Sequence, residues 1–448
     1  MNSSIQWNLF DDPTFSLQLL RAISQTYYKG ADIGECLSTA YRIKESDFEG
    51  WYNEWYKTAK RVHYYAKECL KFGHKISAKE AYLRASNYYR VAEFFIIDPN
   101  DVRSLQTWRL SKECFIQATQ HFPCTFKPIQ IPYQHTKLPG YFFKVNDYSN
   151  NENKKEKQRP IVIVHGGFDS TLEELYFFAA APALERGYNC LAFEGPGQGG
   201  VIREQKIPFR FDWEKVVTPV IDFLLENKEE YCLKKESIAL MGISLGGYLA
   251  ARAAAFEHRI SACILYNGVY DGKEALESSF PPSLLKSIED GNEKVVNTVI
   301  QILMETDSNI KFNIKHGMWT FGIDSPYELV KKSSVFTLKE IASNIRCPTL
   351  VLDAEKDDSF PGQPQKVYNA LTCPKKYILF TIDEGAEEHC QSGAPSLSNQ
   401  RIFDWLDEIF KICDNWGKIQ SRLLISSLIS IFIYIRITWI QLFIYFII

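Results

Sequence analysis

The sequence predicts an α/β protein in which a mostly parallel, doubly wound sheet is joined to an N-terminal helical domain and carries a helical lid insertion. Three observations predict this class. Short apolar runs alternate with helical segments after residue 160, the region before residue 125 has helical periodicity, and a serine between glycines stands where a predicted strand meets a predicted helix. A chain of 448 residues is also too long for one ordinary core, so more than one domain is expected.

Residues 1–125 are predicted to form the helical N-terminal domain. Apolar side chains recur at helical spacing after two Ser-x-x-Glu capping boxes, which begin at Ser46 and Ser77. A third helix is predicted over residues 102–120. Most of the aromatic side chains on these helices are interpreted as packing faces, and a minority of the tyrosines are candidates for lining a substrate cavity.

From Pro128 the apolar periodicity changes to two, which is typical of strands. Residues 129–133 and 141–145 are expected to pair as a hairpin. Six short apolar runs follow, at 161–164, 189–193, 237–241, 262–266, 349–353 and 377–381. Because helical or loop segments separate these runs, a mostly parallel sheet with helices on both faces is favoured, and residues 126–415 are assigned to this domain.

The spacing between predicted strands widens from about residue 272 to residue 339. Helical segments are predicted there at 282–288 and 295–304. An insertion that follows a strand of such a sheet lies beside the carboxyl ends of the strands, so we expect these helices to form a lid over the site.

The last predicted region, residues 416–448, is a hydrophobic C-terminal tail. Residues 423–448 are almost entirely apolar except for Arg436 near the middle. About 20 apolar residues cross a bilayer, but an arginine at the centre of such a span costs at least about 2.5 kcal/mol. A membrane anchor and a non-structural extension are therefore both left open.

The composition is that of a folded globular protein, with 46% hydrophobic and 23% charged residues. A formal net charge of −3 gives no electrostatic reason to expect nucleic acid as a partner. The 11 cysteines include no C-x-x-C pair, which favours a reducing compartment over a disulfide framework or a zinc site. No secretory signal is visible at the N-terminus, so a cytoplasmic protein is expected, with membrane association through residues 423–448 left open.

The segment Gly242-Ile-Ser-Leu-Gly246 follows an apolar run and opens onto a helical one. Strand, sharp turn and helix are the context of a nucleophile elbow, in which a strained serine needs neighbours without Cβ atoms so that strand and helix can approach closely. Ser244 is therefore predicted to be a nucleophile. A merely flexible glycine turn is the alternative, and the flanking strand and helix disfavour it.

A serine hydroxyl is a weak nucleophile until a neighbouring base accepts its proton. In folds with a nucleophile elbow the base follows the serine in the chain, and three histidines do so here. His389 is the candidate, because it stands in a glycine-bearing loop directly after the last predicted strand. His258 ends a helix, where a solvated side chain is expected, and His316 in the predicted lid is the weaker rival.

The acid that orients the histidine is expected after the penultimate predicted strand. Asp357 has the expected spacing, four residues before Pro361. Asp358 is the fallback, which leaves the assignment open by one residue, and Asp353 is less suitable because it is still inside the strand.

An oxyanion needs two preorganised donors. One is predicted to be the N–H of Leu245, directly after the nucleophile. The other is expected from His165-Gly-Gly-Phe-Asp169, as the N–H of Phe168, with Gly167 permitting the close approach. The glycine-rich segment at residues 194–200 lacks the Gly-Lys-Ser/Thr of a nucleotide cradle, so it is interpreted as a structural turn beside the pocket.

Taken together, these motifs resemble those of the α/β-hydrolase superfamily. The narrower resemblance is to the branch that contains 2,6-dihydroxypseudooxynicotine hydrolase and fungal polyketide and pigment hydrolases of the fusarin-cluster type. It covers about residues 10–412. The segments that carry it are the Ser77-Ala-Lys-Glu-Ala-Tyr-Leu-Arg-Ala-Ser-Asn-Tyr-Tyr89 helix, His165-Gly-Gly-Phe-Asp169, Glu194-Gly-Pro-Gly-Gln-Gly199, Gly242-Ile-Ser-Leu-Gly246 and Glu388-His-Cys-Gln391.

The resemblance implies an α/β-hydrolase fold whose catalytic domain is residues 126–415. It also implies a serine hydrolase, without metal or cofactor, that cleaves a carbon–carbon or acyl bond of a small polyketide-like carbonyl compound. An acyltransferase or cyclase that uses the same acyl-serine, and a non-catalytic scaffold that retains the fold, are the alternatives. A small-molecule partner is expected and nucleic acid is not, while a homodimer is left open.

Overall fold

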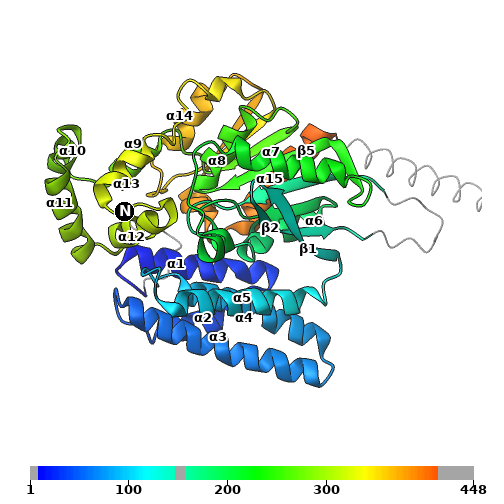
Figure 1. Ribbon diagram of the computed structural model, residues 1–448. Helices are drawn as coiled ribbons and strands as arrows, with labels where there is room; N and C mark the ends of the chain where they lie inside the picture. The colour runs from blue at the N-terminus through cyan, green and yellow to red at the C-terminus, as the bar shows by residue number, and fades with distance from the viewer. Residues whose placement is uncertain (1–8, 147–156, 412–448) are drawn as a thin grey trace, which may run out of the picture. The chain divides into compact units, whose positions relative to one another are not determined.

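The computed structural model describes residues 9–146 and 157–411 (Figure 1). One compact unit ends at Gln400, and a second begins at Arg401. The predicted tail at 416–448, with its apolar stretch 423–448, lies outside the described residues. Within the described ranges, no helix has the length and apolar character needed to cross a bilayer. The predicted domain boundaries stay predictions.

The N-terminal region is helical, as predicted. Its helices are α1 (Pro13–Ser24), α2 (Ile33–Ala40), α3 (Phe48–Lys71), α4 (Lys75–Glu93) and α5 (Val102–Thr119), with a 3-10 turn η1 (Gln25–Tyr28) after α1. Helices α3, α4 and α5 pack on one another in sequence order, and α1 contacts both α4 and α12 (Ser308–Phe321) (Figure 1).

The two capping boxes expected in this region are wrong in position. Helix α3 begins after Asp47, whose carboxylate accepts the N–H of Gly50 at 2.8 Å. Ser46 has a φ of +53°, and its hydroxyl donates instead to Asp12 at 2.7 Å. Helix α4 begins at Lys75, so Ser77 lies inside its first turn. At α3 the Asp47 carboxylate takes the capping role because the Ser46 hydroxyl is bonded to Asp12, and the charge of Asp47 also interacts favourably with the helix dipole. At α4 the N-cap is His74, which makes no side-chain capping bond.

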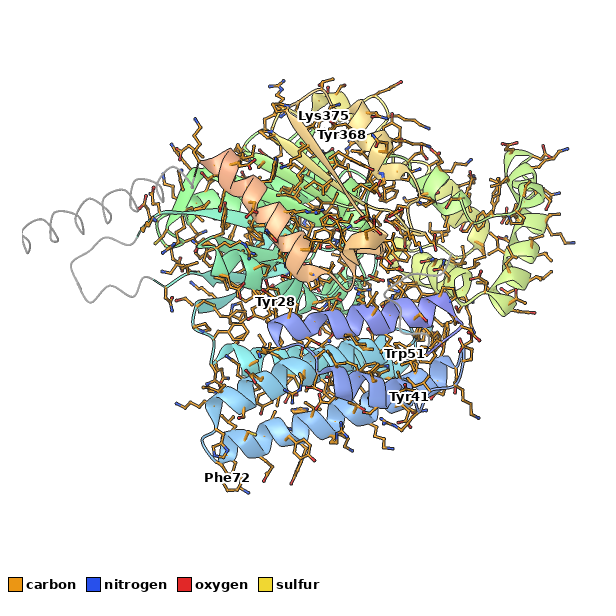
Figure 2. All side chains as sticks on the ribbon, turned by 180° about the vertical axis from the view of Figure 1, so that it is seen from behind. Tyr28, Tyr41, Trp51, Phe72, Tyr368 and Lys375 are labelled. Atoms are coloured by element: carbon orange, nitrogen blue, oxygen red, sulfur yellow. The ribbon has the colours of Figure 1, made fainter. Side chains whose placement is uncertain are left out.

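Aromatic side chains form the interior of the N-terminal helices. Trp51 and Trp55 are fully buried with ring centroids 5.8 Å apart, and the Trp51 indole N–H donates to the carbonyl of Val91 at 2.8 Å. Figure 2 shows Trp51 between helices, whereas Phe72, which is 67% exposed, lies at the outer end of α3. The interpretation of these aromatics chiefly as packing residues agrees with this burial.

The sheet has eight strands in the order β1-β2-β4-β3-β5-β6-β7-β8. The first two form the predicted antiparallel hairpin, β2 pairs antiparallel with β4, and every later pairing is parallel. The strands are β1 (Thr125–Tyr133), β2 (Thr136–Lys144), β3 (Arg159–His165), β4 (Asn189–Phe193), β5 (Leu233–Ile243), β6 (Ala262–Tyr266), β7 (Thr349–Ala354) and β8 (Lys375–Phe380).

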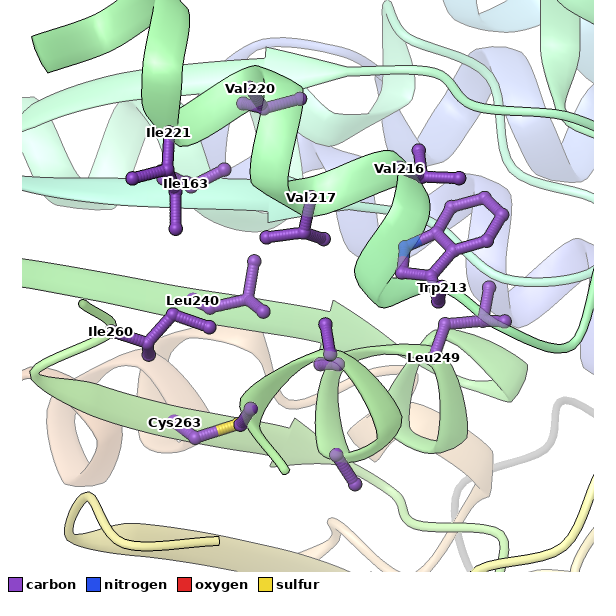
Figure 3. Close-up of a cluster of buried hydrophobic side chains, with 14 of the residues drawn as sticks. Ile163, Trp213, Val216, Val217, Val220, Ile221, Leu240, Leu249, Ile260 and Cys263 are labelled. Atoms are coloured by element: carbon purple, nitrogen blue, oxygen red, sulfur yellow. The ribbon is translucent and has the colours of Figure 1, made fainter. Parts of the chain in front are cut away.

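Both faces of the central strands are buried. Residues 161–164 of β3 have no exposed surface, although successive side chains point to opposite faces. On one face, side chains of α7 (Glu214–Glu226) and α8 (Leu245–Ala254) pack against Ile163 and Leu240 (Figure 3). This packing holds the carboxyl end of β5 and the start of α8 in place.

Short helices and turns lie between the strands. In chain order these are η2 (Tyr176–Ala180), α6 (Ala181–Glu185), η3 (Val201–Gln205), η4 (Ala342–Asn344) and α14 (Gln363–Ala370). After β8 come the turns η5 (Ile382–Glu384) and η6 (His389–Gln391), and α15 (Pro395–Phe410) spans the division between the two units.

Between β6 and β7 the chain forms a group of helices with a small apolar cluster of its own, at the place where the sequence predicts an insertion. The helices predicted at 282–288 and 295–304 are α10 and α11. The group consists of α9 (Gly272–Glu277), α10 (Pro282–Glu289), α11 (Glu293–Thr306), α12 and α13 (Pro326–Ser333). Its action as a lid stays a prediction.

Candidate active site

Ser244 occupies the sharp turn between the last residue of β5 and the first residue of α8. Its φ of +62° and ψ of −127° are unusual for a residue with a side chain, and such strain persists only where the surroundings enforce it. The turn therefore has the backbone conformation expected of a nucleophile elbow.

Glycines on both sides of Ser244 allow this turn. A Cβ atom on Gly242 would lie 1.9 Å from the carbonyl oxygen of Gly246, and one on Gly247 would lie 1.8 Å from the carbonyl oxygen of Asn267. Both neighbours are backbone atoms, which cannot move away cheaply. The close approach of β5, α8 and the chain after β6 thus depends on these two residues.

His389 lies between Ser244 and Asp357. Its Nε2 atom is 2.9 Å from the Ser244 hydroxyl oxygen, and its Nδ1 atom is 2.9 Å from the carboxylate of Asp357. Since a carboxylate only accepts, Nδ1 carries the hydrogen of the neutral ring. Nε2 is then left to accept the serine proton.

Asp357 is the member of the adjacent aspartate pair that reaches the histidine. It is buried, and it accepts hydrogen bonds from the N–H of Ser359 at 2.9 Å and from the side-chain amide of Asn267. Asp358 is exposed at the edge of the cavity. Asp353 instead accepts a hydrogen bond from the hydroxyl of Tyr377 at 2.6 Å.

Sequence reasoning did not identify Asn267. It directly follows β6, where a side chain at the carboxyl end of a strand can face the site, and its φ is +63°. Its position at a strand end was the available signal.

Charge and burial act in opposite directions at the His389–Asp357 pair. Burial raises the pKa of Asp357, but the charge of His389 and the hydrogen bonds to the carboxylate outweigh burial, and the net pKa is lowered. Burial lowers the pKa of His389, but the Asp357 carboxylate outweighs it and raises that pKa well above its usual value. The pair therefore favours a proton on the imidazole.

The other two candidate histidines do not contact Ser244. His258 is exposed just beyond α8. His316 lies on α12, where its Nε2 atom is 3.0 Å from the carbonyl oxygen of Phe168. The weaker rival for the base is thus in contact with the predicted oxyanion loop.

The loop that carries the predicted second oxyanion donor lies against the elbow at Gly167. A Cβ atom on Gly167 would lie 2.7 Å from the backbone nitrogen of Leu245, so a side chain there would prevent the loop from reaching the turn. Among the described residues, neither the N–H of Leu245 nor that of Phe168 has a hydrogen-bond acceptor. Both residues line the same cavity as Ser244.

The glycine-rich turn after β4, residues 194–200, contacts the loop at residues 165–169. The side-chain amide of Gln198 donates to the carbonyl of Gly166 at 2.7 Å, and the carboxyl group of Glu194 accepts the N–H of Leu172 at 2.6 Å and that of Gly200 at 2.8 Å. Burial, together with the nearby Glu173 carboxylate, raises the pKa of Glu194 to about 7. The turn binds protein groups, as expected of a structural turn.

A cavity of about 710 Å³ opens onto Ser244 and His389. Its wall is formed by α1, by the oxyanion loop and by the inserted helices. Apolar lining residues include Leu17, Phe94, Phe168, Phe178, Ile243, Val269, Phe280, Ile310, Phe312, Phe321, Leu329 and Phe336. Polar and charged side chains, among them Arg21, Asp169 and Lys356, line it as well, and a cavity of this size suits a small organic molecule.

Comparison with known proteins agrees with the fold. Residues 159–314 match the family described as alpha/beta hydrolase fold. The chain is 36% identical to 20-hydroxy-prefusarin hydrolase FUS2 of Gibberella moniliformis, over 90% of this chain and 98% of the relative. It is 34% identical to hydrolase acrC of Aspergillus aculeatus, over 89% and 97% of the two chains. Among solved structures, 2,6-dihydroxy-pseudo-oxynicotine hydrolase matches with a TM-score of 0.67 at 21% identity, over 86% of this chain and 95% of that chain.

The match to the solved structure shows the fold alone, because its sequence identity is low. The two fungal relatives are more than 30% identical to this chain, and the alignments cover nearly its whole length. This confirms the resemblance that the motifs indicate. The chain belongs to the α/β-hydrolase family and is a hydrolase related to these fungal enzymes.

Proposed function

We propose that this protein is a serine hydrolase in which Ser244, His389 and Asp357 act as a catalytic triad. The observation that supports the proposal is the position of the His389 imidazole, with one ring nitrogen 2.9 Å from the serine hydroxyl and the other 2.9 Å from the carboxylate. In such an arrangement the base activates the nucleophile and the acid holds the base in the required tautomer.

In the first half-reaction, the Ser244 oxygen attacks the substrate carbonyl carbon while Nε2 of His389 takes the hydroxyl proton. The negative charge that develops on the carbonyl oxygen is stabilised by the N–H groups of Leu245 and Phe168. When the tetrahedral intermediate collapses, the bond to the leaving group breaks, and His389 gives its proton to that group. An acyl-serine remains.

In the second half-reaction, water attacks the acyl-serine and His389 takes a proton from it. Collapse of the second tetrahedral intermediate breaks the bond to the Ser244 oxygen, which regains its proton, and releases a carboxylic acid. The same sequence cleaves an ester, or a carbon–carbon bond next to a ketone if the leaving carbon accepts the proton.

We propose a small, polyketide-like carbonyl compound as the substrate. One relative is named 20-hydroxy-prefusarin hydrolase, after a small molecule. The cavity of about 710 Å³ beside Ser244, with its many aromatic and aliphatic lining residues, supports a small substrate over a protein-sized one. An alcohol or amine in place of water would make the enzyme an acyltransferase, which product analysis with and without an added alcohol distinguishes.

Labelling with a fluorophosphonate probe tests the nucleophile. The full-length protein should be labelled once, at Ser244, and should turn over an activated acyl ester such as 4-nitrophenyl acetate. Ser244→Ala should lose both labelling and turnover while its melting temperature stays nearly unchanged. Retained turnover in a folded Ser244→Ala variant would show that another group is the nucleophile.

A further inference from the structure

The oxyanion loop, residues 166–169, begins with two glycines, Gly166 and Gly167. Glycine restricts the backbone least, so these residues give the loop little conformational restraint of their own. The loop nevertheless carries the N–H of Phe168, whose direction matters for an oxyanion donor. Gln198 restrains the glycine part of the loop through the carbonyl of Gly166, and further restraint comes from groups that contact Phe168 and Asp169.

One such group is His316 of α12. Its Nε2 atom lies 3.0 Å from the carbonyl oxygen of Phe168. A carbonyl can only accept, so Nε2 carries the hydrogen and donates it. The His316 and Phe168 rings also pack edge to face with centroids 4.7 Å apart, so both the backbone and the side chain of Phe168 are held by this residue.

The second group is Arg21 of α1. Its two Nη atoms each lie 3.2 Å from an oxygen of Asp169, while its Nε and Nη2 atoms lie 2.8 Å and 2.6 Å from the oxygens of Glu174. The planar guanidinium thus bridges two carboxylates, one in the loop and one shortly after it. Glu174 is also paired with Arg90 of α4 at 3.4 Å, which links the loop to the N-terminal helices.

The protonation states suit these roles. Burial opposes ionisation of Asp169, but the charge of Arg21 outweighs it and lowers the pKa of that carboxyl group. Burial lowers the pKa of His316, although the Asp169 carboxylate opposes the change. A charged Asp169 accepts the Arg21 donors, and a neutral His316 with its hydrogen on Nε2 donates to the Phe168 carbonyl.

We propose that Arg21 and His316 are positioning residues that orient the Phe168 N–H toward the developing oxyanion, a role that rests on the proposed serine hydrolase chemistry. The carbonyl of Phe168 and the side chain of Asp169 are both held, so the peptide group that follows Phe168 is fixed. On the other side, the side-chain amide of Gln198 lies 2.7 Å from the carbonyl oxygen of Gly166 and 3.4 Å from that of Gly167, whose peptide group carries the Phe168 N–H. Helix α1 and helix α12, which lie outside the sheet, therefore contribute to catalysis as well as to the cavity wall.

Paired substitutions of His316 test the proposal. His316→Phe keeps an aromatic ring against Phe312, whose centroid lies 5.1 Å from that of His316, but removes the donor. His316→Gln keeps a donor. Loss of an oxyanion donor costs about 10²- to 10³-fold in kcat, so a misdirected one should cost about 10- to 100-fold. We expect that loss in His316→Phe, a smaller one in His316→Gln, and KM within about twofold in both. The enzyme concentration used to calculate kcat is the concentration of active sites, determined by titration with fluorophosphonate.

Arg21→Lys should lower kcat in the same way, because a lysine cannot bridge both carboxylates with two donors each. Arg84→Lys is the control. Arg84 pairs with Glu35 at an N–O distance of 3.0 Å, and neither residue belongs to the loop, so this variant should keep the wild-type kcat. A trifluoromethyl ketone forms a tetrahedral adduct with the serine. In Arg21→Lys and His316→Phe, the affinity for this inhibitor should fall by the same factor as kcat/KM. If Arg21→Lys fails to fold, the His316 pair still decides.

Unchanged kcat in His316→Phe, or a rise in KM at constant kcat, would overturn the positioning role and leave Ser244 chemistry intact. Equal loss in His316→Phe and His316→Gln would overturn it as well, because the donor would then not matter. If the wild-type protein neither labels at Ser244 nor turns over ester, the proposed function fails first, and the positioning role falls with it.

Discussion

His389 follows Ser244 by 145 residues, yet its Nε2 atom lies 2.9 Å from the serine hydroxyl oxygen. The serine is delivered by the turn after β5 and the histidine by a short turn after β8, and parallel strands bring these carboxyl ends to one edge of the sheet. The relationship between the two side chains is therefore a product of sheet topology.

Asp357→Asn tests which of the adjacent aspartates acts with His389. An asparagine can present an N–H to the imidazole and favour the wrong tautomer, so kcat should fall by about 10⁴-fold. Asp358→Asn is the matched control, because Asp358 is exposed and should change kcat by less than about twofold. Steady-state hydrolysis of an activated ester measures both. A larger loss in Asp358→Asn than in Asp357→Asn would reverse the assignment.

The pH dependence of kcat/KM should reveal the raised pKa of His389. A protonated imidazole cannot accept the serine proton, so activity should be lost as the pH falls through the pKa of the folded enzyme. The Asp357 carboxylate raises that pKa well above 6.5, so the midpoint of the acid limb should lie above pH 6.5.

In the Asp357→Asn variant, burial acts on the imidazole without the opposing carboxylate. The acid limb of the residual activity should therefore shift to lower pH than in the wild-type enzyme. Profiles at constant ionic strength measure both midpoints. A wild-type midpoint at or below pH 6.5, or no shift in the variant, would contradict the electrostatic description of the pair.

Gly247→Ala should destabilise the fold by about 3 kcal/mol, because overpacking of a tight site typically costs 1–3 kcal/mol and the new Cβ would lie 1.8 Å from a backbone oxygen. Gly34→Ala is the control. Gly34 is exposed in the first turn of α2, and the nearest atom to its Cβ would be a side-chain oxygen of the exposed Asp32 at 3.3 Å, not a backbone atom. Urea unfolding should show a lower free energy of unfolding for Gly247→Ala and no decrease for Gly34→Ala. Equal stability of the two variants would refute the packing argument.

Local signals were sufficient wherever neighbouring residues decide the structure. The elbow, the hairpin and the strands could be predicted because apolar periodicity and glycine placement act within a few residues. Helix starts were less secure: Asp47 caps α3 in place of Ser46, since both are capping residues and the competition depends on Asp12, which is distant in the chain.

The sequence by itself determined the fold class, the family, and a short set of candidate residues at strand ends. Only the tertiary structure decided that Asp357 contacts His389, that Asn267 supports this carboxylate, and that His316 contacts the oxyanion loop instead of the serine. It also brought Arg21 to that loop from 148 residues earlier in the chain. The reason is physical: side-chain chemistry is local to each residue, whereas a hydrogen bond between distant residues depends on the packing of every element between them.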